Sequence, residues 1–277
     1  MAYKRVLTVQ DISCVGQCSL TVALPILSAC GLETGILPSA VLSTHTGGFT
    51  GYTFRDLTDD MPAIEAHWVK EGIRFDAVYT GYLGSARQID YVKSLLHSVA
   101  KPGCLAVVDP AMADNGKLYV GFDDAFVACM RELVKEADYL LPNITEAALL
   151  TGTEYRETYD EAYADSLAEK LLALGAKNVI LTGVGFRPET TGVLVFGKGL
   201  RKYYAHKKID QGCHGTGDVY ASAFVGALLR GKDAYDAAVI AADYVVQCIE
   251  FTQGIPDHRY GVAFEPVLGK LIQSLEK

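Results

Sequence analysis

Short apolar runs alternate with stretches of helical spacing over the first two thirds of the chain. Amphipathic or apolar helices are predicted near residues 19–30 and 85–99. Repeated alternation of strand and helix predicts an α/β fold with a mainly parallel central sheet and helices on both faces. The strands are expected at residues 5–10, 33–38, 76–80, 104–108, 138–141 and 178–181.

The pattern changes after Gly183. Two apolar runs flank Gly197-Lys198-Gly199, which predicts a β-hairpin of residues 192–196 and 200–205. No linker, repeat or low-complexity segment divides the sequence, so residues 1–277 are interpreted as a single domain. The rest of the chain is predicted to be helical, at residues 215–230, 234–251 and 266–275.

The chain carries 25 Lys and Arg against 33 Asp and Glu, a net charge of −8. This acidic balance disfavours nucleic acid as a partner, yet it permits nucleotide binding, because local amides and a metal can hold phosphates. Apolar runs are too short to span a bilayer, and the N-terminal segment lacks a signal-peptide core. A cytoplasmic protein without membrane contact is therefore expected.

Polar residues recur just past the predicted strands, at Asp11, Gly81-Tyr82, Asp109, Asn143 and Thr182-Gly183. Each could be only a turn residue. In open parallel sheets, however, ligands bind at the carboxyl edge of the strands. Five such endings in one chain favour a binding site at this edge.

The segment Gly212-Cys213-His214-Gly215-Thr216-Gly217-Asp218 precedes a predicted buried helix. Its glycines and the free N–H groups of the helix start predict an anion site. Asp218 could then accept a proton from an attacking hydroxyl, and we expect the helix terminus to keep this carboxyl ionised. A glycine helix start with an acidic first turn is the structural alternative.

Six short motifs in order resemble the pyridoxal kinase family of the ribokinase-like superfamily. Across residues 6–249 they are Val9-Gln10-Asp11, Ser43-Thr44-His45-Thr46-Gly47, Thr80-Gly81-Tyr82-Leu83-Gly84-Ser85, Val108-Asp109-Pro110, Pro142-Asn143-Ile144-Thr145-Glu146-Ala147 and Gly215-Thr216-Gly217-Asp218. This superfamily uses no P-loop, and the chain has none. The resemblance implies a single-domain ribokinase-like fold and a homodimer.

The resemblance also implies roles on the phosphate side. Asp218 matches the catalytic base, and Gly215, Thr216 and Gly217 match the anion hole. Asp109 matches an acid near the ATP phosphates and the metal. Asn143 and Glu146 match a motif that holds Mg²⁺ largely through water, although their spacing fits a helix cap equally well. Thr182 and Gly183 match the nucleotide-side strand end, where a plain turn is the alternative.

On the vitamin side, His45, Thr46 and Tyr82 match positions around the pyridine ring. Asp11 departs from the family, which commonly has Ser there, and a carboxylate would favour a protonated ring nitrogen or an aminomethyl group. The segment Gly47-Gly48-Phe49 also departs from the usual aromatic-rich pattern. His214 is interpreted as loop structure or a phosphate neighbour, and Cys213 as packing.

The resulting hypothesis is transfer of the ATP γ-phosphoryl group to the 5′-hydroxymethyl oxygen of pyridoxal, pyridoxamine or pyridoxine. ATP and Mg²⁺ are the expected cofactors, and a monovalent cation such as K⁺ is a further candidate. Two alternatives stay open: a hydroxymethylpyrimidine kinase of thiamin synthesis, and a non-catalytic protein that binds B6 or nucleotide on the same fold. The intact Gly215–Asp218 run argues against the second.

Overall fold

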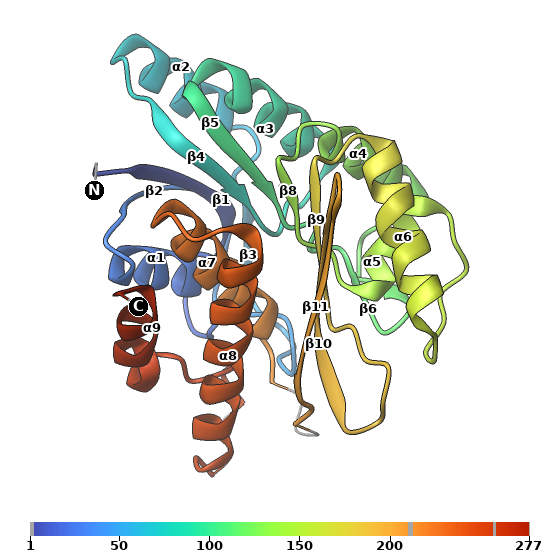
Figure 1. Ribbon diagram of the computed structural model, residues 1–277. Coiled ribbons are helices and arrows are strands. Elements are labelled where there is room, and N and C mark those ends of the chain that lie inside the picture. The colour runs from blue at the N-terminus through green and yellow to red at the C-terminus, as the bar shows by residue number, and fades with distance from the viewer. Residues whose placement is uncertain (1–2, 210–212, 257–258, 277) are drawn as a thin grey trace.

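The computed structural model describes residues 3–209, 213–256 and 259–276. Its main sheet has the strand order β11-β10-β9-β8-β5-β4-β1-β2-β3 (Figure 1). The six strands from β2 to β9 in this order are parallel, and β3, β10 and β11 are antiparallel to their neighbours. The strands are β1 Arg5–Ser13, β2 Glu33–Leu42, β3 Phe54–Asp56, β4 Phe75–Thr80, β5 Ala100–Val108, β8 Tyr139–Leu140, β9 Asn178–Thr182, β10 Thr190–Gly197 and β11 Leu200–Lys207. A separate two-stranded ribbon pairs β6 Ala113–Asp114 with β7 Lys117–Leu118.

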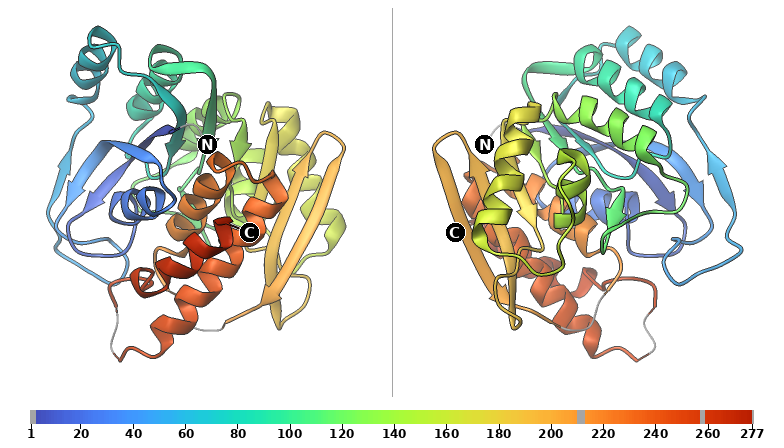
Figure 2. Two further views of the ribbon diagram at one scale, coloured as in Figure 1. Left: turned by 60° about the vertical axis from the view of Figure 1, so that its left-hand side comes forward. Right: turned by 90° about the vertical axis from the view of Figure 1, so that its right-hand side faces the viewer.

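Helices cover both faces of the sheet, as Figures 1 and 2 show, so the predicted α/β fold class is confirmed. One face carries α2 Met61–Lys70, α3 Ala86–Ser98, α4 Asp124–Val134, α5 Ile144–Thr151 and α6 Glu161–Leu174. The other carries α1 Leu20–Ala29, α7 Thr216–Leu229, α8 Ala234–Gln253, the short 3₁₀ turn Glu265–Val267 and α9 Leu268–Glu276.

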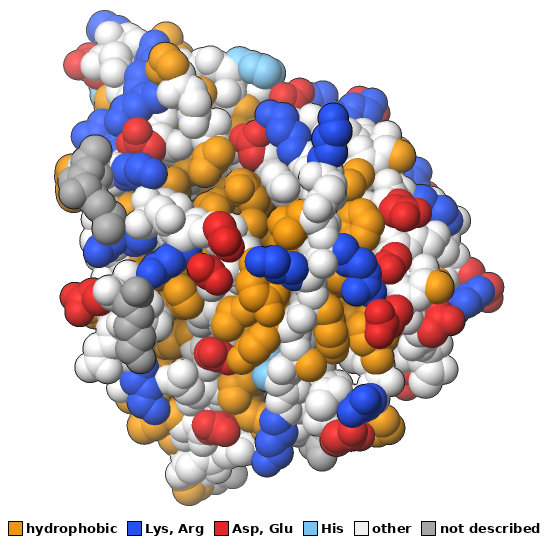
Figure 3. Space-filling model, in the orientation of Figure 1, with side chains coloured by type: hydrophobic (Ala, Val, Ile, Leu, Met, Phe, Trp, Pro, Cys, Tyr) orange, Lys and Arg blue, Asp and Glu red, His pale blue; other side chains and the backbone are white. Residues whose placement is uncertain are grey.

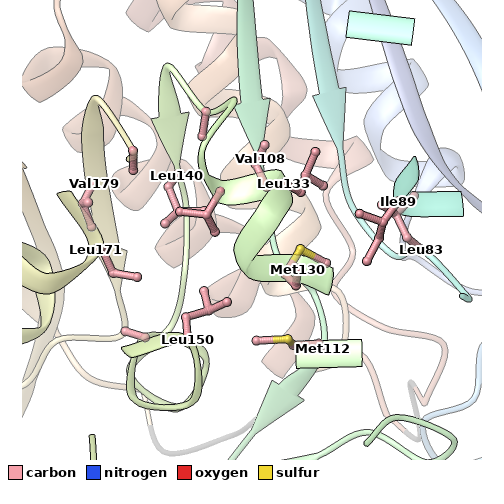
Figure 4. Packing of buried hydrophobic residues seen from close by; sticks show 14 of the residues in the cluster. Leu83, Ile89, Val108, Met112, Met130, Leu133, Leu140, Leu150, Leu171 and Val179 are labelled. Atoms are coloured by element: carbon pink, nitrogen blue, oxygen red, sulfur yellow. The ribbon is translucent and has the colours of Figure 1, made fainter. Parts of the chain in front are cut away.

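Each face has its own apolar core. Figure 4 shows part of the first, where Met130 and Leu133 of α4 pack beside Val108 of β5 and Leu140 of β8. On the second face, α7 is buried on all sides from Val219 to its last residue, because it lies between the sheet, α1 and α8. This burial fixes the helix whose first turn carries Asp218.

The order of the strands reverses direction at β1. The chain moves from β1 outward to β2 and β3, then crosses to the other side of β1 to form β4. Such a switch point opens a crevice at the carboxyl ends of the two strands. It places the ends of β1 and β4 at the centre of the edge where the polar strand endings were predicted to gather.

The first strand is longer than predicted, and Asp11 lies inside it rather than past its end. The pairing of β1 with β2 shifts register between Gln10 and Ile12, which is an irregularity at Asp11. Bulges of this kind re-aim a side chain and are common beside functional sites. Asp11 therefore lies near the carboxyl end of β1 as predicted, but it is part of the strand and sits at the register shift with β2.

Other predicted elements lie within a few residues of the observed ones, except that β2 runs to Leu42 and β5 begins at Ala100. The pattern did not identify α2, α4, α5, α6, β3 or the β6–β7 ribbon. On the face in Figure 3, acidic and basic side chains are intermixed. Among the described residues, no helix combines the length and apolar character needed to cross a membrane.

The contact between α1 and α7 generates a stability prediction. A Cβ at Gly226 would lie 2.4 Å from the sulfur of Cys30, so Gly226→Ala should destabilise the protein by about 1–3 kcal/mol through overpacking. Adding Cys30→Ala should recover part of that loss, because the two sites are coupled. Denaturant unfolding of both single variants and the double variant measures this.

Gly269→Ala in α9 is the matched control, because its Cβ would meet no atom within 4 Å. It should leave stability unchanged or slightly raised. Equal losses at Gly226 and Gly269, or strict additivity with Cys30→Ala, would contradict the packing account.

Candidate active site

The N-terminus of α7 packs tightly against the segment between β1 and α1. Gly215 is the N-cap residue of α7 and has φ 79°. A Cβ there would lie 1.8 Å from the backbone carbonyl oxygen of Gln17, so only glycine fits. At Gly217 a Cβ would have no atom within 4 Å, which leaves the other side of this turn open. The turn thus presents N–H groups of a helix start to open space, as an anion site requires.

Other residues of the same motif hold the turn in place. The Thr216 hydroxyl donates to the Cys213 carbonyl at 3.4 Å. The His214 carbonyl accepts from the Val262 N–H at 3.0 Å. Gly212 lies outside the described residues. This backbone hydrogen bond supports the role in loop structure that the sequence predicted for His214.

Asp218 lies in the first turn of α7, among other acids. Burial and then the negative charge of Asp109 raise the pKa of Asp218 to about 7, although the Ser19 N–H stabilises the charged form. The helix terminus therefore does not keep the pKa of this carboxyl at its ordinary low value. Desolvation and the nearby acid outweigh the dipole of the helix.

Asp109 and Glu146 form a second acidic pair beside this helix start. Burial and the charge of Glu146 raise the pKa of Asp109, and burial raises the pKa of Glu146. A cation would favour both charged forms, and oxygen donors suit Mg²⁺. Within the described ranges no three His, Cys, Asp or Glu side chains could hold a metal ion.

The structure shows that Asn143 and Glu146 form a capping box at the start of α5. The Asn143 Oδ1 accepts from the Glu146 N–H, and Glu146 Oε2 accepts from the Asn143 N–H, each at 2.9 Å. Glu146 Oε1 also accepts from the Met112 N–H at 3.0 Å, and Asn143 Nδ2 donates to the Ala113 carbonyl at 2.8 Å. Because both Glu146 oxygens are engaged, the cap reading holds, and a metal would be reached most easily through water.

Asp11 lies in β1, and Tyr82 follows the end of the neighbouring strand β4. Asp11 is buried, and its Oδ2 accepts from the Ser13 hydroxyl at 3.2 Å. Burial, partly offset by hydroxyl hydrogen bonds, raises the pKa of Asp11. Burial and then the charge of Asp11 raise the pKa of Tyr82 to about 12. The two predicted ring-binding residues are therefore close neighbours.

His45 joins the loop after β2 to the loop before α7. Its ring lies 5.5 Å from the His214 ring and 5.0 Å from the Phe49 ring, between centroids. The ring is buried, and its Nε2 has no hydrogen-bond partner. Burial and then His214 lower the pKa of His45, which favours the neutral imidazole. Thr46, next in the chain, is exposed.

Thr182 and Gly183 end β9 at the same edge. The Thr182 hydroxyl donates to the Pro142 carbonyl at 3.3 Å, beside the capping box. Gly183 has φ 68° and is exposed, and its carbonyl accepts from the Tyr159 hydroxyl at 3.3 Å. Thr182 and Gly183 thus lie near the start of α5, which carries Glu146, whereas the segment of His45 follows β2 on the other side of β1 in the strand order.

Two residues that the sequence did not indicate also belong to this site. Tyr119 follows the β6–β7 ribbon and is 43% exposed, and its partial burial and then the charges of Glu146, Asp114, Asp109 and Asp218 raise its pKa. Ser19 precedes α1 with φ 51°, a conformation rare for serine. Neither position has a local pattern that separates it from an ordinary loop residue.

The chain is similar to known kinases over most of its length. A family model described as phosphomethylpyrimidine kinase matches residues 36–262. A pyridoxine/pyridoxal/pyridoxamine kinase of Bordetella avium is 31% identical over 263 residues, which cover 90% of this chain and 85% of that protein. A hydroxymethylpyrimidine/phosphomethylpyrimidine kinase of Bacillus subtilis is 31% identical over 222 residues, 78% of each chain.

Solved structures extend the likeness over nearly the whole chain. The pyridoxal kinase of Lactobacillus plantarum is 34% identical with a TM-score of 0.91 and covers 98% of both chains. A Bacteroides thetaiotaomicron protein, crystallised with pyridoxal, is 37% identical with a TM-score of 0.92 and covers 98% of this chain and 96% of that one. The chain belongs to the phosphomethylpyrimidine kinase family, and the resemblance to pyridoxal kinases is confirmed within it.

Proposed function

We propose that this chain is an ATP-dependent vitamin B6 kinase, which phosphorylates the 5′-hydroxymethyl group of pyridoxal, pyridoxamine or pyridoxine. The observation that carries the proposal is Asp218, a carboxyl with a pKa near 7 in the first turn of a helix whose start is open to a ligand. A general base is most effective when its pKa lies near the working pH. The relatives named for B6 vitamers support this choice of alcohol.

The proposed reaction divides the crevice between two ligands. The N–H groups at Gly215, Thr216 and Gly217 stabilise charge on the transferring phosphoryl group, and Asp218 takes the proton of the attacking hydroxyl. ATP lies on the side of Asn143, Thr182 and Gly183, with residues 1–277 acting as one kinase domain. Mg²⁺ held near Asp109 and Glu146 would supply positive charge to the phosphates. The family resemblance implies these roles, and the position, burial and charge of the residues support them.

The vitamin ring lies on the other side, between Asp11, Tyr82 and the loop of His45 and Thr46. Tyr82 offers an aromatic face, and the neutral His45 a hydrogen-bonding edge. Asp11 is a buried carboxyl whose ionised form needs a partner, since an unpaired charge in that environment is costly. A cationic group on the substrate would provide it.

Hydroxymethylpyrimidine is the second candidate substrate, because the Bacillus subtilis relative has the same 31% identity as the Bordetella avium one, although over 222 residues rather than 263. An ATP-consumption panel with pyridoxal, pyridoxamine, pyridoxine and hydroxymethylpyrimidine, run with and without K⁺, tests both. Turnover of the pyrimidine alone would overturn the proposal in favour of its rival. Binding without turnover of any alcohol would favour the non-catalytic alternative.

The proposal includes a homodimer. The edge strand β3 is exposed throughout and includes Phe54, which is 50% exposed, so this edge of the sheet leaves backbone groups for a second copy to pair with. Light scattering of the purified chain measures its mass in solution, and a monomer at all concentrations would remove this part of the proposal.

Asp218→Asn should lower kcat by about 10²–10⁴-fold while ATP binding persists, because the amide cannot accept the proton.

The raised pKa of Asp218 also predicts how the same variant changes thermal stability. An acid with a folded-state pKa above its unfolded value makes the fold less stable as pH rises between the two values. The neutral variant should therefore melt at a higher temperature at pH 7. Near-normal kcat would remove Asp218 from the mechanism.

Glu146→Gln and Asp109→Asn should raise the magnesium concentration for half-maximal rate by about 10–100-fold, more than they raise the vitamin KM. The physical reason is the loss of one negative charge from the acidic pair. Magnesium titrations at saturating ATP measure the effect, and thermal melts control for the capping box that Glu146 completes. Titration curves that overlay the parent would show the metal assignment to be wrong.

Asp11→Ser should lower kcat/KM for pyridoxamine relative to pyridoxal by about tenfold or more. Pyridoxamine presents an ammonium group at neutral pH, and a charge-assisted hydrogen bond contributes roughly 1.5–3 kcal/mol. Measuring both substrates with both proteins gives the ratio, and Asp11→Asn is the near-isosteric control. An unchanged ratio with lower stability would mean that Asp11 serves only the register shift of β1.

A further inference from the structure

The loop that carries Tyr82 is bound by a buried side chain in the first turn of α3. Ser85 is the N-cap residue of this helix, and its hydroxyl accepts from the Gln88 N–H at 3.4 Å. The two residues have the spacing of a capping box, in which the Gln88 side chain would accept from the Ser85 N–H. In the structure Gln88 Oε1 accepts from the Gly84 N–H, one residue earlier, at 2.7 Å. Gln88 therefore holds the loop before the helix and not only the helix start.

The nitrogen of the same side-chain amide is bound to β2 and to the segment around the end of β3. Gln88 Nε2 donates to the Ser39 carbonyl at 2.9 Å and to the Thr58 hydroxyl at 2.8 Å, and it lies 3.3 Å from Asp56 Oδ1. The Gly84 N–H can only donate and the Ser39 carbonyl can only accept, so these two partners fix the orientation of the amide. Gln88 is 1% exposed, and its hydrogen bonds are therefore shielded from water.

A second hydrogen bond from β2 holds Tyr82 directly. The Ser39 hydroxyl donates to the Tyr82 carbonyl at 3.1 Å, and Ser39 is fully buried. The segment from Tyr82 to Gly84 is thus tied to Ser39 at two points, once directly and once through the Gln88 amide. Beyond this clamp the Tyr82 ring lies 5.5 Å from the Phe122 ring, between centroids.

Of the groups that the amide binds, the Gly84 N–H depends on it most. The Ser39 carbonyl also accepts from the Leu57 N–H at 3.1 Å. The Thr58 hydroxyl also donates to Asp56. Both groups keep a polar partner without the amide, so its removal mainly releases the loop that carries the tyrosine.

We infer that Gln88 is a positioning residue, which sets where the Tyr82 ring lies by holding the Gly84 N–H and the Ser39 carbonyl with one amide. The inference rests on the proposed function for the role of Tyr82 beside the substrate ring. It does not depend on which alcohol is the substrate, since Tyr82 offers an aromatic face to a pyridine or a pyrimidine. A displaced aromatic face weakens binding of the alcohol, so the effect falls on KM rather than on kcat.

Gln88→Met in the whole chain keeps a side chain of similar size and removes the amide. The pyridoxal KM should rise about threefold to tenfold, with kcat and the ATP KM within about twofold, and Tm should fall by about 2–8 °C. Gln88→Asn, whose shorter side chain cannot reach both partners, should raise the pyridoxal KM in the same direction and serves if the methionine variant does not fold. Gln88→Met combined with Tyr82→Ala should have the KM of Tyr82→Ala alone, because Gln88 acts through that ring.

Thr58→Val is the matched control, because it removes a hydrogen bond of the same amide on the side away from Tyr82. It should lower Tm and leave the pyridoxal KM within about twofold. A parental KM in a folded Gln88→Met or Gln88→Asn variant would overturn the inference. Equal rises in KM for Gln88→Met and Thr58→Val would also overturn it, since KM would then follow stability alone.

Failure of the proposed function gives a different result. If the parent turns over hydroxymethylpyrimidine instead of a B6 vitamer, the same comparison is made with the KM of that alcohol. If the parent turns over none of the four alcohols, the proposed function fails, and a crystal structure of the Gln88 variant still decides the inference. A Tyr82 ring displaced from its contact with Phe122 would support the inference, and an unmoved ring would overturn it.

Discussion

The close approach of two backbones, Gly215 against the carbonyl of Gln17, is the constraint on which the rest of the site depends. It joins the loop after β1 to the start of α7, segments about two hundred residues apart in the sequence. No side chain can intervene, so the position of the helix N-terminus relative to β1 is set by backbone contact alone. Asp218, the open N–H groups and the strained Ser19 all take their places from this contact.

The second physical constraint at this edge of the sheet is the burial of acidic side chains. The pKa values of Asp11, Asp109, Glu146 and Asp218 are all raised, and burial is the first cause in each case. A chain selected only for stability would not gather four such acids at one sheet edge. A divalent cation or a cationic group on a ligand would favour the charged forms of these acids and so reverse the cost. The sheet and the buried α7 supply the stability that this arrangement lowers.

Structural and functional explanations coincide at the capping box. Asn143 and Glu146 satisfy the first turn of α5, and the proposed function gives the same two side chains a second task beside the phosphates. Fixed by these hydrogen bonds, Glu146 cannot swing toward a metal without loss of the cap. A water-mediated contact reconciles both tasks and suits an ion that keeps its waters.

The sequence by itself determined the α/β class, most strands and the edge where the polar residues gather, because period and turn chemistry are local properties. The helices α4 and α6 have buried residues at helical spacing, which a sequence pattern can reveal. In α2 only Met61 is buried, so its sequence carries almost no such apolar spacing. Only the tertiary structure decided the raised pKa of Asp218, the register shift at Asp11 and the strain at Ser19. These depend on burial and on contacts between distant segments, which no local pattern encodes.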